Sequence, residues 1–81
     1  MNNPNVTVRL REWHAETSHS VGGFSIHITV SGQTATQEGP SYRNRAERAD
    51  GLRTTRPMAQ VFADGLGVEL QEELLEKFPE P

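Results

Sequence analysis

The sequence predicts an α+β fold in which a three-stranded antiparallel meander packs against two or three C-terminal helices. In the first half, residues 5–13 and 24–30 alternate between apolar and polar side chains, as strands with one buried face do. In the second half, apolar side chains recur at the roughly 3.6-residue spacing of amphipathic helices. The 81 residues suffice for one small domain, residues 1–81, but not for two.

The first strand is predicted at residues 5–13. Its apolar side consists of Val6, Val8 and Leu10. Its other side carries Trp13 together with Arg9 and Arg11. Because tryptophan and arginine are enriched at protein interfaces, we predict a partner-binding surface there. The alternative is that the C-terminal helix covers this side of the strand and buries the tryptophan.

The second strand, residues 24–30, has the clearest alternation. Ser31-Gly32 after it suits a two-residue hairpin turn, because glycine accepts a positive φ angle. The third strand, about residues 33–38, contributes few apolar side chains and is expected at an edge of the sheet, ending at Gly39-Pro40. An uncovered edge offers unpaired backbone groups to another chain, so we expect that this edge can form a homodimer.

The first helix is predicted to begin at Ser41, whose hydroxyl can accept a hydrogen bond from a free amide of the first turn. Its buried stripe spans about 120° of the helix surface. The stripe consists of Tyr42, Ala46, Ala49 and Leu52. Gly51 weakens the end of this helix, and Thr54-Thr55 interrupts it.

Pro57 suits the first turn of a second helix, where the N–H that proline lacks has no partner in any case. This helix is predicted to end at Asp64-Gly65, with Met58, Val61 and Phe62 as its apolar face. Alternatively, residues 58–62 form a fourth strand. A third helix is predicted at residues 68–78. Its broad apolar side consists of Val68, Leu70, Leu74, Leu75 and Phe78.

Residues 41–57 contain five arginines, although the whole chain has a net charge of −3. They are Arg43, Arg45, Arg48, Arg53 and Arg56. On a helix that starts at Tyr42 they point in different directions, whereas a nucleic-acid interface gathers positive charge on one surface. We therefore interpret them as a solvated helix surface, with nucleic-acid binding through residues 41–56 as the alternative function.

Four glutamates of the predicted third helix recur at i, i+3, i+4 and i+7, within about 100° of its surface. They are Glu69, Glu72, Glu73 and Glu76. Like charges at this spacing slightly destabilise a helix, so a purely structural helix gains nothing from them. They form either an ordinary solvated face or a strip that binds a basic surface of a larger partner protein.

The sequence carries no recognisable catalytic or metal-site motif. There is no cysteine, and His14, His19 and His27 lack the HExxH spacing of a zinc site. No glycine-rich loop carries a phosphate-binding lysine, and no nucleophile-elbow pattern surrounds a serine. We therefore expect no catalytic residues, no metal and no cofactor, and we predict that the protein is not an enzyme.

Targeting and membrane signals are also missing from the sequence. The N-terminal residues contain no apolar run, and no stretch approaches the roughly 20 apolar residues that span a bilayer. The lack of cysteine suits a reducing compartment. We therefore expect a cytoplasmic protein that does not contact a membrane, with disordered ends at residues 1–4 and 79–81.

Several features of the middle of the chain occur together in one known pattern: the strand FSIHITV, the Ser31-Gly32 turn, the TQEGPSY segment, Ala46 with Ala49, and Gly51-Leu52. In this combination residues 23–56 resemble the YegP-like family of small uncharacterised bacterial domains. The resemblance covers about 40% of the chain, lacks the second repeat of that family and leaves residues 58–81 without a counterpart. It implies a ββα unit that associates through strand edges, and it implies no reaction.

Together these observations predict a non-enzymatic protein-binding module. Small size, the lack of site chemistry and an acidic helix face suit an inhibitor or adaptor that occupies a basic surface of a larger protein. By analogy of size and charge, one version of this prediction is a phage-encoded inhibitor of a nucleic-acid-handling defence complex.

Overall fold

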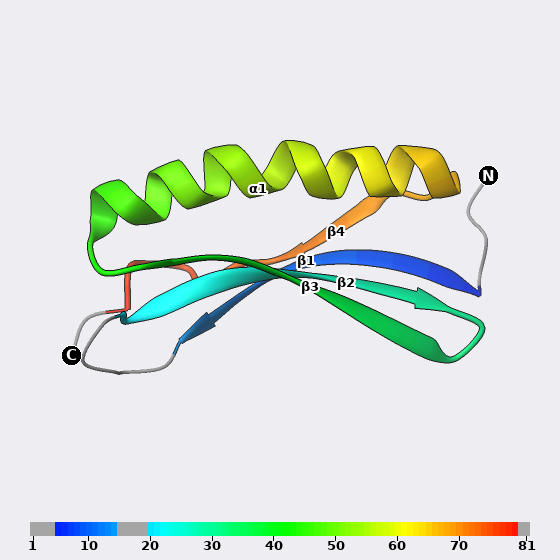
Figure 1. The fold of residues 1–81 in the computed structure, drawn as a ribbon, viewed down its shortest axis with the longest axis horizontal. Coiled ribbons are helices and arrows are strands. Elements are labelled where there is room, and N and C mark those ends of the chain that lie inside the picture. Colours follow the sequence, from blue (N-terminus) through cyan, green and yellow to red (C-terminus); the bar gives the residue numbers. More distant parts are fainter. Residues whose placement is uncertain (1–4, 15–19, 80–81) are drawn as a thin grey trace.

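The computed structural model describes residues 5–14 and 20–79 (Figure 1). The elements follow in the order β1 (Val6–His14), β2 (Gly22–Val30), β3 (Gln33–Tyr42), α1 (Arg45–Leu66) and β4 (Leu70–Glu73). The strands form one sheet in the order β3-β2-β1-β4, and α1 lies along one face of it (Figure 1). The predicted α+β class and the antiparallel meander are confirmed, but β4 runs parallel to β1 and makes the sheet mixed. Apart from Pro79, the ends that we expected to be disordered lie outside the described residues.

Strands β1 and β2 form as the alternation predicts, because each places its apolar side chains on the face that α1 covers. They pair antiparallel, with Val8 beside Ile28. The turn from β2 to β3 consists of Ser31 and Gly32, whose φ angles of 50° and 84° are those of a two-residue hairpin turn.

Strand β3 continues beyond its predicted end, to Tyr42. Gly39 and Pro40 lie in a bulge opposite Phe24, where the pairing register shifts. A Cβ atom on Gly39 would lie 2.9 Å from the Phe24 carbonyl oxygen, so the strand needs glycine there. Proline is tolerated at a bulge on an edge strand, because no ladder hydrogen bond is lost. The extension makes Tyr42 the last residue of β3 instead of the first residue of a helix, and it buries the ring.

One helix occupies the region where two were predicted. It begins after Asn44, not Ser41, and the Asn44 side chain accepts a hydrogen bond of 2.9 Å from the amide of Glu47. It continues through Pro57 and ends at Gly67, whose left-handed conformation caps the last turn. An interior proline costs about 3 kcal/mol, so tertiary packing must offset that loss.

Small side chains at every fourth position provide this packing. The buried residues of α1 are Gly51, Thr55, Ala59 and Ala63. They let the helix lie close to the sheet, and a Cβ atom on Gly51 would already lie 3.0 Å from the Phe24 ring. The predicted stripe was wrong in part, because Ala46 and Ala49 are exposed. In the predicted second helix, Met58 and Val61 are also 46% and 69% exposed.

The third predicted helix does not form. Residues Leu70–Glu73 instead pair with β1 as β4, with Leu70 beside Val8, and no helix follows among the described residues. Leu74 and Phe78 still pack against the core, from an irregular segment. The physical reason is that β1 has a second edge to pair, and the backbone hydrogen bonds of that edge outweigh a helix with four like charges on one side.

The hydrophobic core lies between α1 and the sheet and is small. Its buried members are Val8, Leu10, Phe24, Ile26, Tyr42, Ala59 and Ala63. Thr55 lies among them, 2% exposed, and its hydroxyl has no hydrogen-bond partner among the described residues.

Thr55→Val is therefore expected to stabilise the protein by about 1 kcal/mol, because it replaces an unsatisfied buried hydroxyl by a methyl group of similar shape. Urea unfolding followed by circular dichroism measures the change. Thr54→Val is the matched control, since the exposed Thr54 hydroxyl donates to the Asp50 carbonyl oxygen and its loss is expected to be nearly neutral or slightly destabilising. If Thr55→Val stabilises the protein no more than Thr54→Val does, the Thr55 hydroxyl is not an unsatisfied buried group.

Candidate functional site

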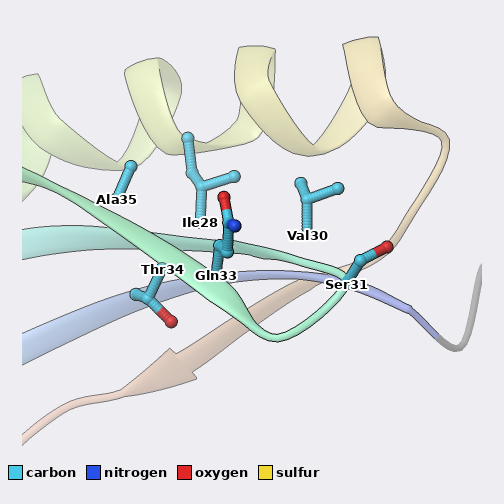
Figure 2. A pocket seen from close by; sticks show the side chains of 6 residues that line it. All are labelled: Ile28, Val30, Ser31, Gln33, Thr34 and Ala35. Carbon is cyan, nitrogen blue, oxygen red and sulfur yellow. The ribbon is translucent and has the colours of Figure 1, made fainter.

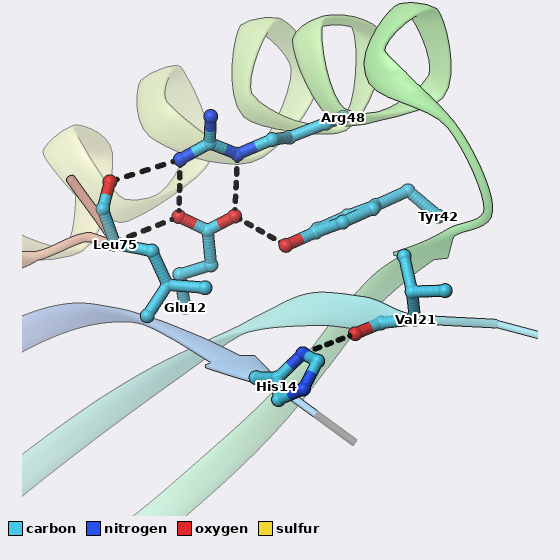
Figure 3. A network of polar contacts seen from close by, with 6 residues as sticks. All are labelled: Glu12, His14, Val21, Tyr42, Arg48 and Leu75. Carbon is cyan, nitrogen blue, oxygen red and sulfur yellow. Dashed lines mark hydrogen bonds and ion pairs between the residues drawn. The ribbon is translucent and has the colours of Figure 1, made fainter. Parts of the chain in front are cut away.

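The most densely bonded group in the described chain is the carboxylate of Glu12, on the side of β1 that faces α1 (Figure 3). Its side chain is fully buried and ion-paired with Arg48 of α1. The Arg48 guanidinium donates two hydrogen bonds to it, of 2.6 and 2.8 Å. The Tyr42 hydroxyl and the Leu75 amide also donate to it. Arg48 donates in addition to the Leu75 carbonyl oxygen, at 3.0 Å.

These contacts set the protonation states of the network. Burial by itself raises the pKa of Glu12, but the hydrogen bonds from Arg48, Tyr42 and the Leu75 amide outweigh burial and hold the pKa below its usual value. Burial, followed by the hydrogen bond to Glu12, raises the pKa of Tyr42 well above its usual value. The hydrogen bond to Glu12 likewise raises the pKa of Arg48. At neutral pH the network therefore holds an ionised carboxylate, a guanidinium and a neutral phenol.

This network acts as a structural lock. Each carboxylate oxygen accepts two hydrogen bonds, so neither has capacity left for a substrate proton. The partners come from β3, α1 and the segment after β4, which the carboxylate joins to β1. No motif in the sequence marks Glu12 as the centre of such a network. The buried position of Glu12 could still be predicted from the alternation of β1. That alternation continues from Val6, Val8 and Leu10 and puts Glu12 on the buried side.

The arginines of the middle segment already have partners within the chain. Four of them pair with carboxylates: Arg43 with Glu47, Arg48 with Glu12, Arg53 with Asp50 and Arg56 with Glu72. The Arg45 guanidinium lies over the Phe78 ring, 5.0 Å from its centroid. The structure therefore gives each of the five a contact within the chain, and nucleic-acid binding by them remains a hypothesis without added support.

The four glutamates of the predicted acidic face do not share one surface. Glu72 lies on the helix side of β4 and pairs with Arg56 at 2.7 Å. Glu73 points to the opposite side, where it lies 3.6 Å from Arg9 and 2.8 Å from Arg11. Glu69, which precedes β4 in the sequence, and Glu76, which follows it, are both exposed. The helical acidic face was wrong because successive strand residues point to opposite sides of the sheet.

The sheet face opposite α1 is covered by no helix or strand of the described residues (Figure 1). The strand registers place these side chains on it: Thr7, Arg9, Arg11, Trp13, Ser25, His27, Thr29, Thr34, Thr36, Glu38, Gln71 and Glu73. We call this set the open face. It brings together the predicted surface of Trp13, Arg9 and Arg11, and its only aromatic ring besides the imidazole of His27 is the Trp13 indole.

Trp13 lies directly against the neighbouring strand. Its partner across the sheet is Gly23, and a Cβ atom there would lie 2.3 Å from the indole Cζ2. Only glycine leaves room for the ring in this position, and Trp13 is partly buried. The second strand was predicted at residues 24–30, so Gly23 lay outside it, whereas β2 begins at Gly22.

Hydrogen bonds between side chains hold much of the rest of the open face in place. His27 lies 2.8 Å from the Ser25 hydroxyl and 3.3 Å from that of Thr36. The hydroxyls of Thr29 and Thr34 lie 2.9 Å apart. Two arginines and two glutamates balance the charge of this face. His14, at the end of β1, donates from Nδ1 to the Val21 carbonyl oxygen (Figure 3).

Comparisons with protein-family models, curated proteins and solved structures found no match to this chain. The resemblance of residues 23–56 to the YegP-like family therefore stays a prediction. Residues 5–14 and 20–79 contain no group of three histidine, aspartate or glutamate side chains placed to hold a metal ion. His19 lies outside the described residues. The one described helix is not apolar enough to cross a bilayer.

Glu12→Ala is expected to lower the free energy of unfolding by about 3–5 kcal/mol, because it leaves Arg48 and Tyr42 without their buried acceptor. Urea unfolding measures the loss, and Glu12→Gln, which keeps one acceptor oxygen, is expected to lose less. Glu69→Ala is the matched control, since this exposed side chain is expected to contribute less than about 0.5 kcal/mol. If Glu12→Ala and Glu69→Ala lose the same unfolding free energy, the Glu12 network is not a structural lock.

The lock also predicts a pH dependence. The lowered pKa of Glu12 contributes stability that is present above pH 4.5 and is lost as the pH falls through the folded-state pKa. The raised pKa of Tyr42 contributes stability that is present below pH 10.0 and is lost as the pH rises further. Unfolding free energies measured across both limits are expected to fall less steeply in acid for Glu12→Gln and less steeply in alkali for Tyr42→Phe. If the unfolding free energies of these variants change with pH as steeply as those of the wild type, Glu12 and Tyr42 are not the groups responsible.

Proposed function

We propose that the chain is a non-enzymatic protein-binding module that docks its partner on the open face. The observation that carries the proposal is Trp13, a partly buried ring held against Gly23 on a sheet face that no described helix or strand covers. A tryptophan that is held in one position and keeps part of its ring in solvent suits an interface hot spot, since little side-chain freedom is lost on binding.

The groups around Trp13 support this reading. Arg9 and Arg11 both contact Glu73, so their guanidinium groups are positioned before a partner arrives. Two arginines share this one carboxylate, which leaves a local positive charge beside the indole. A matching partner surface combines an apolar recess for the ring with a carboxylate for Arg11.

The charge balance of the open face favours a protein over a nucleic acid. Binding to phosphates needs an excess of positive charge on one surface, whereas this face carries equal numbers of arginines and glutamates. The predicted acidic helix face, with its basic partner surface, has no counterpart in the fold. A module without a reaction of its own acts by occupying a surface of a larger protein, as an inhibitor or adaptor.

Trp13→Ser is expected to abolish capture of the partner, because it removes the aromatic anchor. Affinity capture from nuclease-treated lysate of the source cell, quantified by mass spectrometry, tests this. Gly23→Ala is expected to weaken capture as well, since the new methyl group displaces the indole without removing it. Trp13 is the only tryptophan, so a shift in its fluorescence emission reports the displacement directly.

Met58→Ser is the matched control for these variants. Met58 is an exposed apolar residue of α1, which lies on the other side of the sheet, so this variant is expected to capture as wild type does. Circular dichroism of each variant excludes unfolding as the cause. Capture that survives both Trp13→Ser and Gly23→Ala rejects the proposal. Binding that appears only when nucleic acid is left in the lysate and is lost in Arg43→Glu/Arg53→Glu favours the nucleic-acid alternative instead.

A further inference from the structure

The two outer edges of the sheet differ in how they are protected. At one edge, β4 is only four residues long, and its Glu72 and Glu73 are held in ion pairs. At the other edge, β3 is exposed along residues 33–38 and carries no charged side chain from Gln33 to Gln37. Edge strands that avoid pairing are usually short, charged or interrupted by proline. The first six residues of β3 have none of these features except the charge of Glu38.

The hairpin turn determines which backbone groups of β3 are free. In a two-residue turn, the flanking residues Val30 and Gln33 form a hydrogen-bonded pair, and such pairs alternate along the ladder. The N–H and C=O groups of Thr34, Thr36 and Glu38 therefore point away from β2, where the Glu38 carbonyl oxygen accepts a long hydrogen bond of 3.5 Å from the side chain of Gln37. The bulge at residues 39–40 ends this regular edge.

We infer that β3 is a homodimer interface, in which two copies pair their β3 strands antiparallel about a two-fold axis at Thr36. In this register Thr36 lies opposite Thr36 of the second copy, and Thr34 lies opposite its Glu38. The outward backbone groups then form about six hydrogen bonds between the copies. The interface is isologous, because each copy contributes the same segment.

Self-complementarity is the reason to place a second copy there and not an unrelated strand. The register puts no like charges opposite each other, since Glu38 faces a threonine. On the helix side of the sheet, small Ala35 lies opposite Gln37 of the second copy. Charged, short β4 then forms both outer edges of the dimer, so the assembly closes at two copies.

An uncovered hollow on the helix side adjoins the same edge (Figure 2). It measures about 490 Å³ and is lined by Ile28, Val30, Ser31, Gln33, Thr34 and Ala35. Figure 2 shows Ile28, Val30 and Ala35 pointing toward the side that α1 occupies. Gln37 of the second copy comes beside Ala35 and can lay its methylene groups toward Ile28. The dimer thus covers part of the apolar surface around Ile28 and Ala35 that the single chain leaves open.

The dimer has a consequence for docking. A two-fold axis perpendicular to the sheet keeps both helices on one face and joins the two open faces on the other. The result is a continuous eight-stranded sheet with two Trp13 anchors, which can hold two sites of one partner or two copies of it.

A single engineered cysteine tests the register, because the chain has no cysteine of its own. Opposed residues in such a pair have Cα atoms about 5.5 Å apart, within the range of a disulfide. Thr36→Cys is expected to form a disulfide-linked dimer under mild oxidation, whereas Gln71→Cys on β4 is not. Equal crosslinking of both variants, or none of Thr36→Cys, overturns the inference.

Sedimentation equilibrium tests the dimer without a crosslink. The wild type is expected to dimerise with a dissociation constant in the micromolar range, and Thr36→Lys is expected to raise it at least tenfold by opposing two like charges. Gln71→Lys is the matched control and is expected to leave the constant unchanged. A monomeric wild type at millimolar concentration, or a dimer insensitive to Thr36→Lys, overturns the inference. Trp13→Ser is expected to leave dimerisation unchanged, so failure of this inference is distinguishable from failure of the docking proposal.

Discussion

The carboxylate of Glu12 joins β1 to β3, to α1 and to the segment after β4. It accepts four hydrogen bonds, and their donors are Arg48, which gives two, Tyr42 and the Leu75 amide. An apolar core with seven fully buried members leaves little other means of holding the end of β3, the start of α1 and the segment after β4 against β1. A buried ion pair of this kind adds little net stability, because the desolvation of both charges offsets their attraction. Removal of either partner is nevertheless costly, since it leaves an uncompensated buried charge.

A second constraint is the close approach of α1 to the sheet. Its buried positions carry glycine, threonine and alanine, so the helix backbone itself forms much of the contact. A single helix of 22 residues covers only one face of four strands. The opposite face stays open, and hydroxyl, imidazole and charged groups occupy it with one tryptophan among them. A surface for a docking partner is available on the open face because one helix cannot cover both faces of the sheet.

The charge distribution of the sequence has an internal explanation. Residues 40–57 carry a net charge of +3 and residues 58–81 a net charge of −5. The fold joins these segments directly through Arg56 and Glu72, and Arg48 holds the Leu75 carbonyl oxygen. A basic segment followed by an acidic one therefore helps to fasten the C-terminal part of the chain to α1.

Local patterns in the sequence were enough to predict most of the first half of this structure. Alternation with a period of two is a property of neighbouring residues, so β1, β2, the Ser31-Gly32 turn and the side on which Trp13 lies could all be predicted. The inward position of Glu12 was implicit in the same pattern. The two-residue turn also placed the edge strand, although the bulge that extends β3 depends on Phe24 across the sheet.

The second half of the structure depends on contacts between segments that are far apart in the sequence. Leu70, Leu74 and Phe78 fit a helical stripe, while Val68 and Leu70 also fit a strand, and local spacing cannot choose between them. The choice depended on the unpaired edge of β1, about 60 residues earlier in the chain. Likewise, Pro57 ends a helix in most local contexts, but contacts of Thr55 and Ala59 with the sheet carry α1 past it. Propensities act over a few residues and amount to about 1 kcal/mol each, so burial and pairing between distant segments overrode them.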